Sequence, residues 1–161
     1  MNQIQMAAFE LQLTEVTELQ AAGHDLSGCL LAASSAHDPS PEEQRVMIRF
    51  LEQSGASVNE TDKNGVTPLH RAVRFRSPEA VALLLEFGAD LSATDKKSGS
   101  TPLHRAVTNT GAPATAGKKD HAIQIVKILL GYGADPKAKN RKGLAPIDYA
   151  KNDELRAALR P

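Results

Sequence analysis

Apolar residues recur every three to five positions along most of this chain, and polar stretches that contain glycine interrupt them. Such spacing is typical of amphipathic helices separated by turns. In residues 1–22 it favours helix, with a break near Leu11 that divides the segment into two helices. The helices predicted further along occupy residues 29–36, 41–53, 68–75, 78–88, 101–108, 122–132, a short stretch from 146, and 153–159. We therefore expect an all-α protein.

The helix that begins at Pro41 has strong start signals. Ser40 can cap it with its side chain, Pro41 suits the first helical position, and Glu43 completes a capping box. The apolar face that this helix is expected to bury consists of Val46, Met47, Phe50 and Leu51.

The chain also repeats itself. The seven residues 67–73, TPLHRAV, occur again letter for letter at 101–107, and each copy follows a glycine two positions earlier. A weaker third copy, GLAPIDYA, occupies 143–150, and the phrase LLEFGADL at 84–91 matches LLGYGADP at 129–136. Repetition at such a period indicates units that stack and bury their faces against their neighbours.

A Thr-Pro-Leu-His-x-Ala helix start, an apolar second helix that ends in Gly-Ala-Asp, and a polar turn before the next glycine resemble the ankyrin repeat. The resemblance implies a solenoid of stacked helix-turn-helix units joined by hairpin-like turns. We expect a single domain, residues 1–161. Its units are a degenerate N-terminal cap repeat (1–26), a repeat with an inserted inter-helix loop at 34–40 (27–64), a complete repeat (65–98), a repeat with an inserted loop at 109–120 (99–142), and a C-terminal cap repeat (143–161).

Two positions depart from the family pattern. Arg76 stands where these repeats usually have glycine, which would cost about 1 kcal/mol if the position needs a positive φ. The insertion at 109–120 is rich in Gly, Ala, Pro and Thr, a composition that predicts a mobile loop.

The composition limits the cellular compartments in which we expect the protein. Cys29 is the single cysteine, so no intramolecular disulfide can form, and this fits a reducing compartment. Its place on an apolar face predicts a buried structural thiol. The N-terminus has no basic start followed by an apolar run, and no stretch approaches the length of a membrane span. We expect a cytoplasmic protein that makes no membrane contact.

The zero net charge hides a strong polarity along the chain. Residues 1–62 carry ten acidic residues against two arginines, a net charge of −8, and the remaining residues carry +8. In a linear stack this predicts an acidic end and a basic end. We expect a monomer, with head-to-tail association of the two ends as an alternative.

No residues group into a catalytic or metal-binding pattern, so we expect no enzyme activity, no cofactor and no metal. His70 and His104 occupy one repeat position and should lie on the order of 10 Å apart, too far for proton transfer between them. Asp148 takes the same position in the third copy. The resemblance implies that these histidines are structural and tie neighbouring turns together.

The resemblance places the binding surface on the turn tips and the exposed face of each first helix, which line the concave side. Lysines at successive tips beside Arg71 and Arg105 would form a basic stripe able to bind carboxylates. For any single cation the simpler interpretation is a solubilising role. The candidate protein-binding residues are Asp62, Lys63, Asn64, Asp95, Lys96, Lys97, Asn140, Arg141 and Lys142 at the tips, and Arg71, Arg74, Phe75, Arg105, Thr108 and Asn109 on the first helices.

These features favour a non-enzymatic protein–protein interaction module that binds a partner with an acidic patch and acts as a scaffold or steric inhibitor. The phrase KSGSTPLH at 97–104, with the insertion after it, also resembles small stand-alone bacterial ankyrin proteins, which implies a translocated effector or adaptor using the same surface. Nucleic-acid binding through the basic half is disfavoured, because the basic residues lack stacking aromatics and the acidic half would repel phosphate.

Overall fold

A computed structural model describes residues 1–36, 40–108 and 119–160 of the chain. Within these residues the secondary structure is entirely helical, as predicted. The helices are α1 (Gln3–Phe9), α2 (Leu13–Ala21), α3 (Cys29–Ala33), α4 (Pro41–Gln53), α5 (Pro68–Arg74), α6 (Pro78–Glu86), α7 (Pro102–Val107), α8 (Lys119–Gly131), α9 (Pro146–Tyr149) and α10 (Asp153–Ala158).

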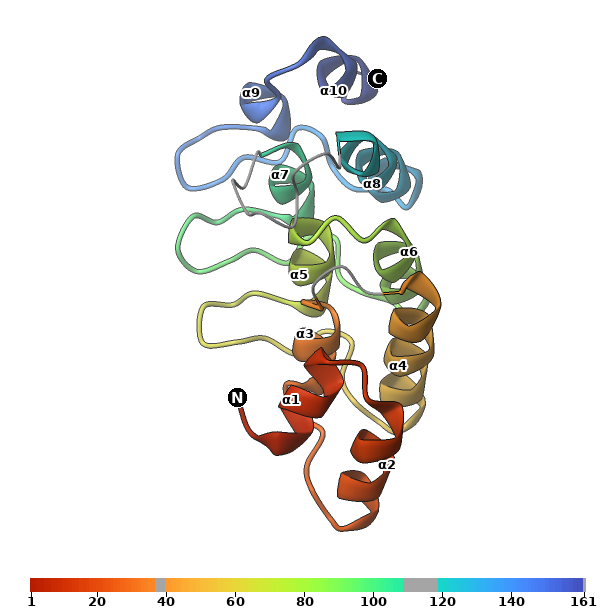
Figure 1. Cartoon of the computed structure of the whole chain (residues 1–161). Helices are drawn as coiled ribbons and strands as arrows, with labels where there is room; N and C mark the ends of the chain where they lie inside the picture. The colour runs from red at the N-terminus through yellow and green to blue at the C-terminus, as the bar shows by residue number, and fades with distance from the viewer. Residues whose placement is uncertain (37–39, 109–118, 161) are drawn as a thin grey trace.

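The helices form two layers in a linear stack (Figure 1). The odd-numbered helices lie above one another in one layer and the even-numbered helices form the second. Three long turns, residues 54–67, 87–101 and 132–145, extend beyond the layer of odd-numbered helices. The predicted solenoid of helix-turn-helix units is therefore confirmed, and each predicted unit contains one helix pair, although the unit boundaries themselves stay a prediction.

Small aliphatic side chains fill the space between the layers. Leu69 and Leu103, the equivalent leucines of the two identical heptapeptides, are both fully buried. Buried leucine, isoleucine, valine and alanine side chains from every pair form one continuous cluster along the stack. Because the helices from α3 onward, together with α1, pack on the equivalent helix of the next pair, the core is a chain of neighbour contacts with no single centre.

Local signals explain most helix ends. The predicted break near Leu11 is present, and Leu11 itself has a positive φ of 59° between α1 and α2. Ser40 Oγ accepts a hydrogen bond from the Glu43 amide, 3.5 Å away, and Pro41 occupies the first position of α4. Asn152 caps α10 in the same way, by accepting from the Leu155 amide.

The buried face of α4 differs from the prediction. Val46 was expected inside but its side chain is 41% exposed, and Phe50 is half-buried. The face that packs inward carries Gln44, Met47, Ile48 and Leu51, which are spaced three and four residues apart. Val46 lies on the opposite side of the helix from these positions, so it points outward.

Gln44 is a polar member of that face that apolar periodicity could not identify. Its amide Nε2 donates to the carbonyl of Ala33, 2.9 Å away, and its Oε1 accepts from the hydroxyl of Ser77 at 2.6 Å. Ala33 is the last residue of α3 and Ser77 caps the start of α6, so one buried side chain connects three helices. Because its hydrogen bonds are made within the protein, its burial carries little penalty.

Two helix boundaries lie three residues from the expected ones, and the other expected boundaries are met to within two residues. Helix α8 begins at Lys119, although the sequence suggested a start at Ala122 and an insertion that reached Asp120. Asp120 in the first turn favours this earlier start through the helix dipole. Helix α3 ends at Ala33, short of the expected Ala36. Residues 37–39 and 109–118, which include most of the two predicted loops, lie outside the described residues, and so does the predicted mobility of the second loop.

Arg76 has the backbone conformation that its departure from glycine suggested, with a φ of 58°. Its side chain is only 6% exposed, and its two terminal nitrogens donate to the carbonyls of Ala106 at 2.6 Å and Thr108 at 2.9 Å. Burial lowers the pKa of the guanidinium, but these carbonyls lie at the C-terminal end of α7, where positive charge is favoured. Arg76 therefore ties one repeat to the next despite its strained backbone.

We expect Arg76→Met to lower the free energy of unfolding by about 2 kcal/mol, because it removes two charge-assisted hydrogen bonds and leaves the strained φ in place. Arg74→Met, two positions away at an exposed site, is the matched control and should change stability by less than about 0.5 kcal/mol. Urea denaturation followed by circular dichroism measures both. Equal stability of the two variants would show that the Arg76 bonds contribute nothing.

Candidate functional site

Each long turn ends in a tip that closes around one acceptor side chain. Asp62 Oδ1 accepts from the amides of Asn64 at 2.8 Å and Val66 at 3.0 Å. Asn140 Oδ1 plays the same role at its own tip, accepting from the amides of Lys142 and Leu144. These side chains are therefore used to hold the shape of the tips.

Asp95 forms the most extensive of these networks. Its carboxylate accepts from the amides of Lys97, Ser98 and Ser100, at 2.7 to 3.1 Å, and from the hydroxyl of Ser98 at 2.7 Å. It is only 2% exposed. Burial acts to raise its pKa, but the Ser98 hydrogen bonds and the nearby charge of Arg105 outweigh burial and lower the pKa to about 2.

Neighbouring tips are joined to one another. The Lys96 amide donates to the carbonyl of Asn64 at 2.8 Å, and the Arg141 amide donates to the carbonyl of Ser98 at 3.0 Å. At Gly99, where φ is 64°, an added Cβ atom would lie 2.9 Å from Cγ of Arg141, so the tips approach too closely for a side chain there. The three tips therefore form one connected edge of the stack.

The two repeated histidines link each first helix to the next tip. Nε2 of His70 lies 3.0 Å from the carbonyl oxygen of Ser100, and Nε2 of His104 lies 3.0 Å from that of Leu144. A carbonyl can only accept, so Nε2 carries the proton in both. Nδ1 of each ring is then an acceptor for its own repeat's threonine, Thr67 or Thr101. The predicted structural role is confirmed, and burial lowers the pKa of His70.

The predicted basic stripe is partly neutralised by the tips. Arg71 pairs with Asp62 at 2.8 Å, and Arg105 lies 3.4 Å from the carboxylate of Asp95. In each repeat the first-helix arginine thus interacts with the tip carboxylate nine or ten positions earlier. Such partly exposed pairs contribute little stability, but they fix the direction of both arginine side chains.

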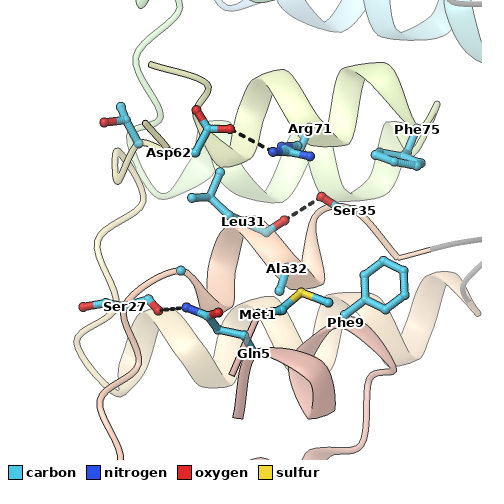
Figure 2. A pocket seen from close by; sticks show the side chains of 12 residues that line it. Met1, Gln5, Phe9, Ser27, Leu31, Ala32, Ser35, Asp62, Arg71 and Phe75 are labelled. Carbon is cyan, nitrogen blue, oxygen red and sulfur yellow. Dashed lines mark hydrogen bonds and ion pairs between the residues drawn. The ribbon is translucent and has the colours of Figure 1, made fainter. Parts of the chain in front are cut away.

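A pocket lies toward the N-terminal end of the surface formed by the first helices and the tips, between α1, α3 and α5 (Figure 2). The family resemblance predicts that this surface is the concave side of the stack. We call the cavity the apolar pocket. It has a volume of about 650 Å³, and its apolar lining residues are Met1, Phe9, Leu31, Ala32 and Phe75. Figure 2 shows Phe9 and Phe75 toward one end and the paired Asp62 and Arg71 on the upper rim.

Of this pocket the sequence identified Asp62, Arg71 and Phe75 but missed Phe9 and Leu31. The repeat pattern could have identified these two residues, because the first helices occupy equivalent positions along the stack. This equivalence is hard to see in the two N-terminal repeats, since neither carries the Thr-Pro-Leu-His start.

A second concavity, here called the basic groove, lies at the C-terminal half beside α7 and α9. Its volume is about 410 Å³. It brings together Lys97, Arg105, Thr108, Arg141 and Lys142, all of which the sequence had suggested. Ser98, Ser100, His104 and Tyr149 complete its lining, so no carboxylate is among the described residues that line it.

The remaining candidates lie elsewhere. Lys63, Asn64, Arg74 and Lys96 are exposed outside both cavities. Asp95 and Asn140 are buried beneath the tips. Asn109 lies outside the described residues. The structure thus divides the predicted stripe into an apolar half and a basic half.

Other reactive groups are accounted for by the fold. Cys29 is buried, and burial together with the charge of Glu60 raises the pKa of its thiol to about 11. Glu60 in turn accepts from the amides of Gly28 at 2.7 Å and Leu31 at 3.0 Å, at the start of α3.

Within residues 1–36, 40–108 and 119–160 no three His, Cys, Asp or Glu side chains are placed to hold a metal ion. In the same ranges no helix has both the length and the apolar character required to cross a bilayer.

The Asp95 network makes stability depend on pH. Its folded pKa of about 2 lies below the ordinary value of 3.8, so the ionised carboxylate contributes stability above about pH 4 that is lost as pH falls toward 2. We expect Asp95→Asn to lower the free energy of unfolding by about 2 kcal/mol at pH 7, with the difference shrinking below pH 4. Urea titrations at several pH values measure this, with exposed Asp135→Asn as the control. A difference that stays constant from pH 7 to 2 would contradict the assignment.

Comparison with known proteins gives relatives over the same region. A family model for ankyrin repeats (3 copies) matches residues 30–140. "Ankyrin repeat, SAM and basic leucine zipper domain-containing protein 1" of Colobus guereza is 34% identical over 107 residues, which cover 66% of this chain and 21% of that protein. The protein of the same name from Rhinolophus ferrumequinum is 26% identical over 152 residues, covering 86% of this chain and 30% of its own length.

The chain thus spans less than a third of the length of these relatives. The match of the family model covers more than half of the chain and includes both histidines, the whole tie from His70 to Ser100, and the tips at Asp62 and Asp95. Stacked helix pairs, tips joined edge to edge and a shared family model lead to one conclusion: the chain belongs to the ankyrin-repeat family.

Proposed function

We propose that this protein binds a partner protein on its concave surface and acts as a scaffold or steric inhibitor. Ankyrin repeats are in general non-enzymatic protein–protein interaction modules. The observation that carries the proposal is that both cavities open on one surface, formed by the first helices and the tips. The second helices do not line either of them.

Rigidity supports this proposal. The histidine ties and the bonds between tips hold α5, α7 and the tips in place before any partner arrives, and these elements supply part of the lining of the apolar pocket and most of that of the basic groove. A surface that is already ordered loses little conformational entropy on binding. Such a platform favours steric and electrostatic recognition over chemistry.

A protein partner agrees better with the surface than nucleic acid does. The cations of the basic groove are confined to one concavity, whereas a strand of nucleic acid needs a longer basic path with aromatic faces for its bases. Tyr149 is the aromatic residue in the groove, and its hydroxyl accepts a hydrogen bond from the side-chain Nδ2 of Asn140. An effector or adaptor role, a cytoplasmic location and a monomeric state remain parts of the proposal, and all would use the same surface.

Site-specific photo-crosslinking in lysate tests the proposal. A photoreactive amino acid is placed at one exposed position at a time, either on the concave side or on a second helix. The concave positions are Thr61, Lys97 and Lys142, and the matched second-helix positions are Arg45, Gln124 and Lys127. We expect the same protein to be crosslinked from the concave positions only. Equal crosslinking from the second helices would contradict the proposed surface.

A further inference from the structure

We propose that the concave surface recognises one linear segment of its partner, in which a large apolar side chain and a cluster of Asp or Glu residues lie about five or six residues apart. The apolar side chain would enter the apolar pocket and the carboxylates would lie in the basic groove. This inference rests on the proposed function and specifies the partner's chemistry.

The apolar pocket has the composition needed to hold such a side chain. Phe9 and Phe75 come from α1 and from the end of α5, and Leu31 and Ala32 from α3 lie between them in the stack. Burying an apolar group among these side chains is favourable because it removes apolar surface from water. A ligand carboxylate would be repelled here by the carboxylate of Asp62 on the rim. Partial burial acts to raise the pKa of Asp62, but the hydrogen bonds that it accepts from backbone amides and from Arg71 lower this pKa.

Arg71 adds a polar contact that points to a peptide. Its Nη2 pairs with Asp62, but its Nε is buried and has no hydrogen-bond partner among the described residues. A ligand would reach this Nε only after a movement of the side chain, which as a whole is 31% exposed. A peptide backbone carbonyl at the rim would supply an acceptor for this arginine, which an isolated small apolar molecule lacks.

The basic groove complements carboxylates. Asp95 offsets part of the charge of Arg105, so the exposed positive charge comes from Lys97, Arg141 and Lys142. The hydroxyl-bearing residues Ser98 and Thr108 lie beside them. No carboxylate among the described lining residues competes for these cations, so acidic side chains are the fitting ligand.

The spacing follows from the stack. The apolar pocket extends from α1 to α5, the groove lies beside α7 and α9, and each first helix packs on the next along this series. Packed helices lie about 8–10 Å apart, so two steps separate the cavities by roughly 16–20 Å. An extended chain covers about 3.3 Å per residue, which gives about five or six residues.

Selection from a random dodecapeptide library displayed on phage tests the inference with the full chain as bait. We expect enriched peptides to carry Leu, Ile, Met, Phe or Trp about five or six residues from two or more acids. Enriched peptides without acids, or without the spacing, would overturn the inference. So would a complete lack of enrichment. In each of these cases the crosslinking pattern still decides the proposed function separately.

Matched variants then locate the binding of one enriched peptide, synthesised with a fluorescent label and measured by anisotropy. Lys97→Glu/Lys142→Glu should weaken binding at least tenfold, whereas Lys127→Glu/Lys151→Glu, which makes the same charge change at exposed sites outside the groove, should leave it unchanged. Phe75→Ser should weaken binding about tenfold, and its control is Tyr132→Ser at a 49% exposed site. Urea denaturation confirms that all variants fold.

Three results would overturn the inference at this stage. Equal loss in both charge variants would mean diffuse attraction only, and no effect of Phe75→Ser would remove the apolar pocket from the site. Equally tight binding of oligo(dT) of the same charge, with the same dependence on Lys97 and Lys142, would identify a polyanion site in place of an acidic peptide site.

Discussion

Two buried histidines each donate a hydrogen bond to the tip of the following repeat, and this contact joins the repeats from α5 to α9. The bond joins a first helix to a carbonyl thirty or forty positions later, so it fixes the distance between neighbouring repeats. The acceptor side chains of the tips, Asp62, Asp95 and Asn140, then hold each tip in the shape that presents that carbonyl. In a stack whose stability comes from neighbour contacts, these ties set the geometry of every surface beyond them.

Pairs between tip carboxylates and first-helix arginines contribute to the chemical division of the surface formed by the first helices and the tips. Each tip carboxylate attracts the arginine of its own first helix, so Arg71 and Arg105 are turned toward the tips. What remains toward the N-terminus is an apolar hollow between α1 and α5, and what remains toward the C-terminus is a cluster of lysines and Arg141. The two cavities on this surface therefore differ in chemistry, one with an apolar lining and one with a basic lining.

Repetition made much of this predictable. A heptapeptide that recurs unchanged must occupy equivalent places, so the helix pairs and the structural role of the two histidines followed from the sequence and its resemblance to the ankyrin repeat. The positive φ at Arg76 was a conditional expectation, and the structure confirms it. The sequence did not predict the contacts between side chains that no repeated pattern specifies. The pairing of Arg71 with Asp62, the inward rotation of Ile48 in place of Val46, and the pocket between α1 and α5 depend on how helices rotate against one another. Hydrophobic periodicity fixes such rotations only to within about one residue.

Hydrogen–deuterium exchange of the protein, alone and in complex with its crosslinked partner, tests whether the partner binds on the concave surface. We expect slower exchange in α3, α5, α7 and the three tips, with α4, α6 and α8 unchanged, because the partner covers the concave surface only. Slower exchange confined to the second helices would contradict it.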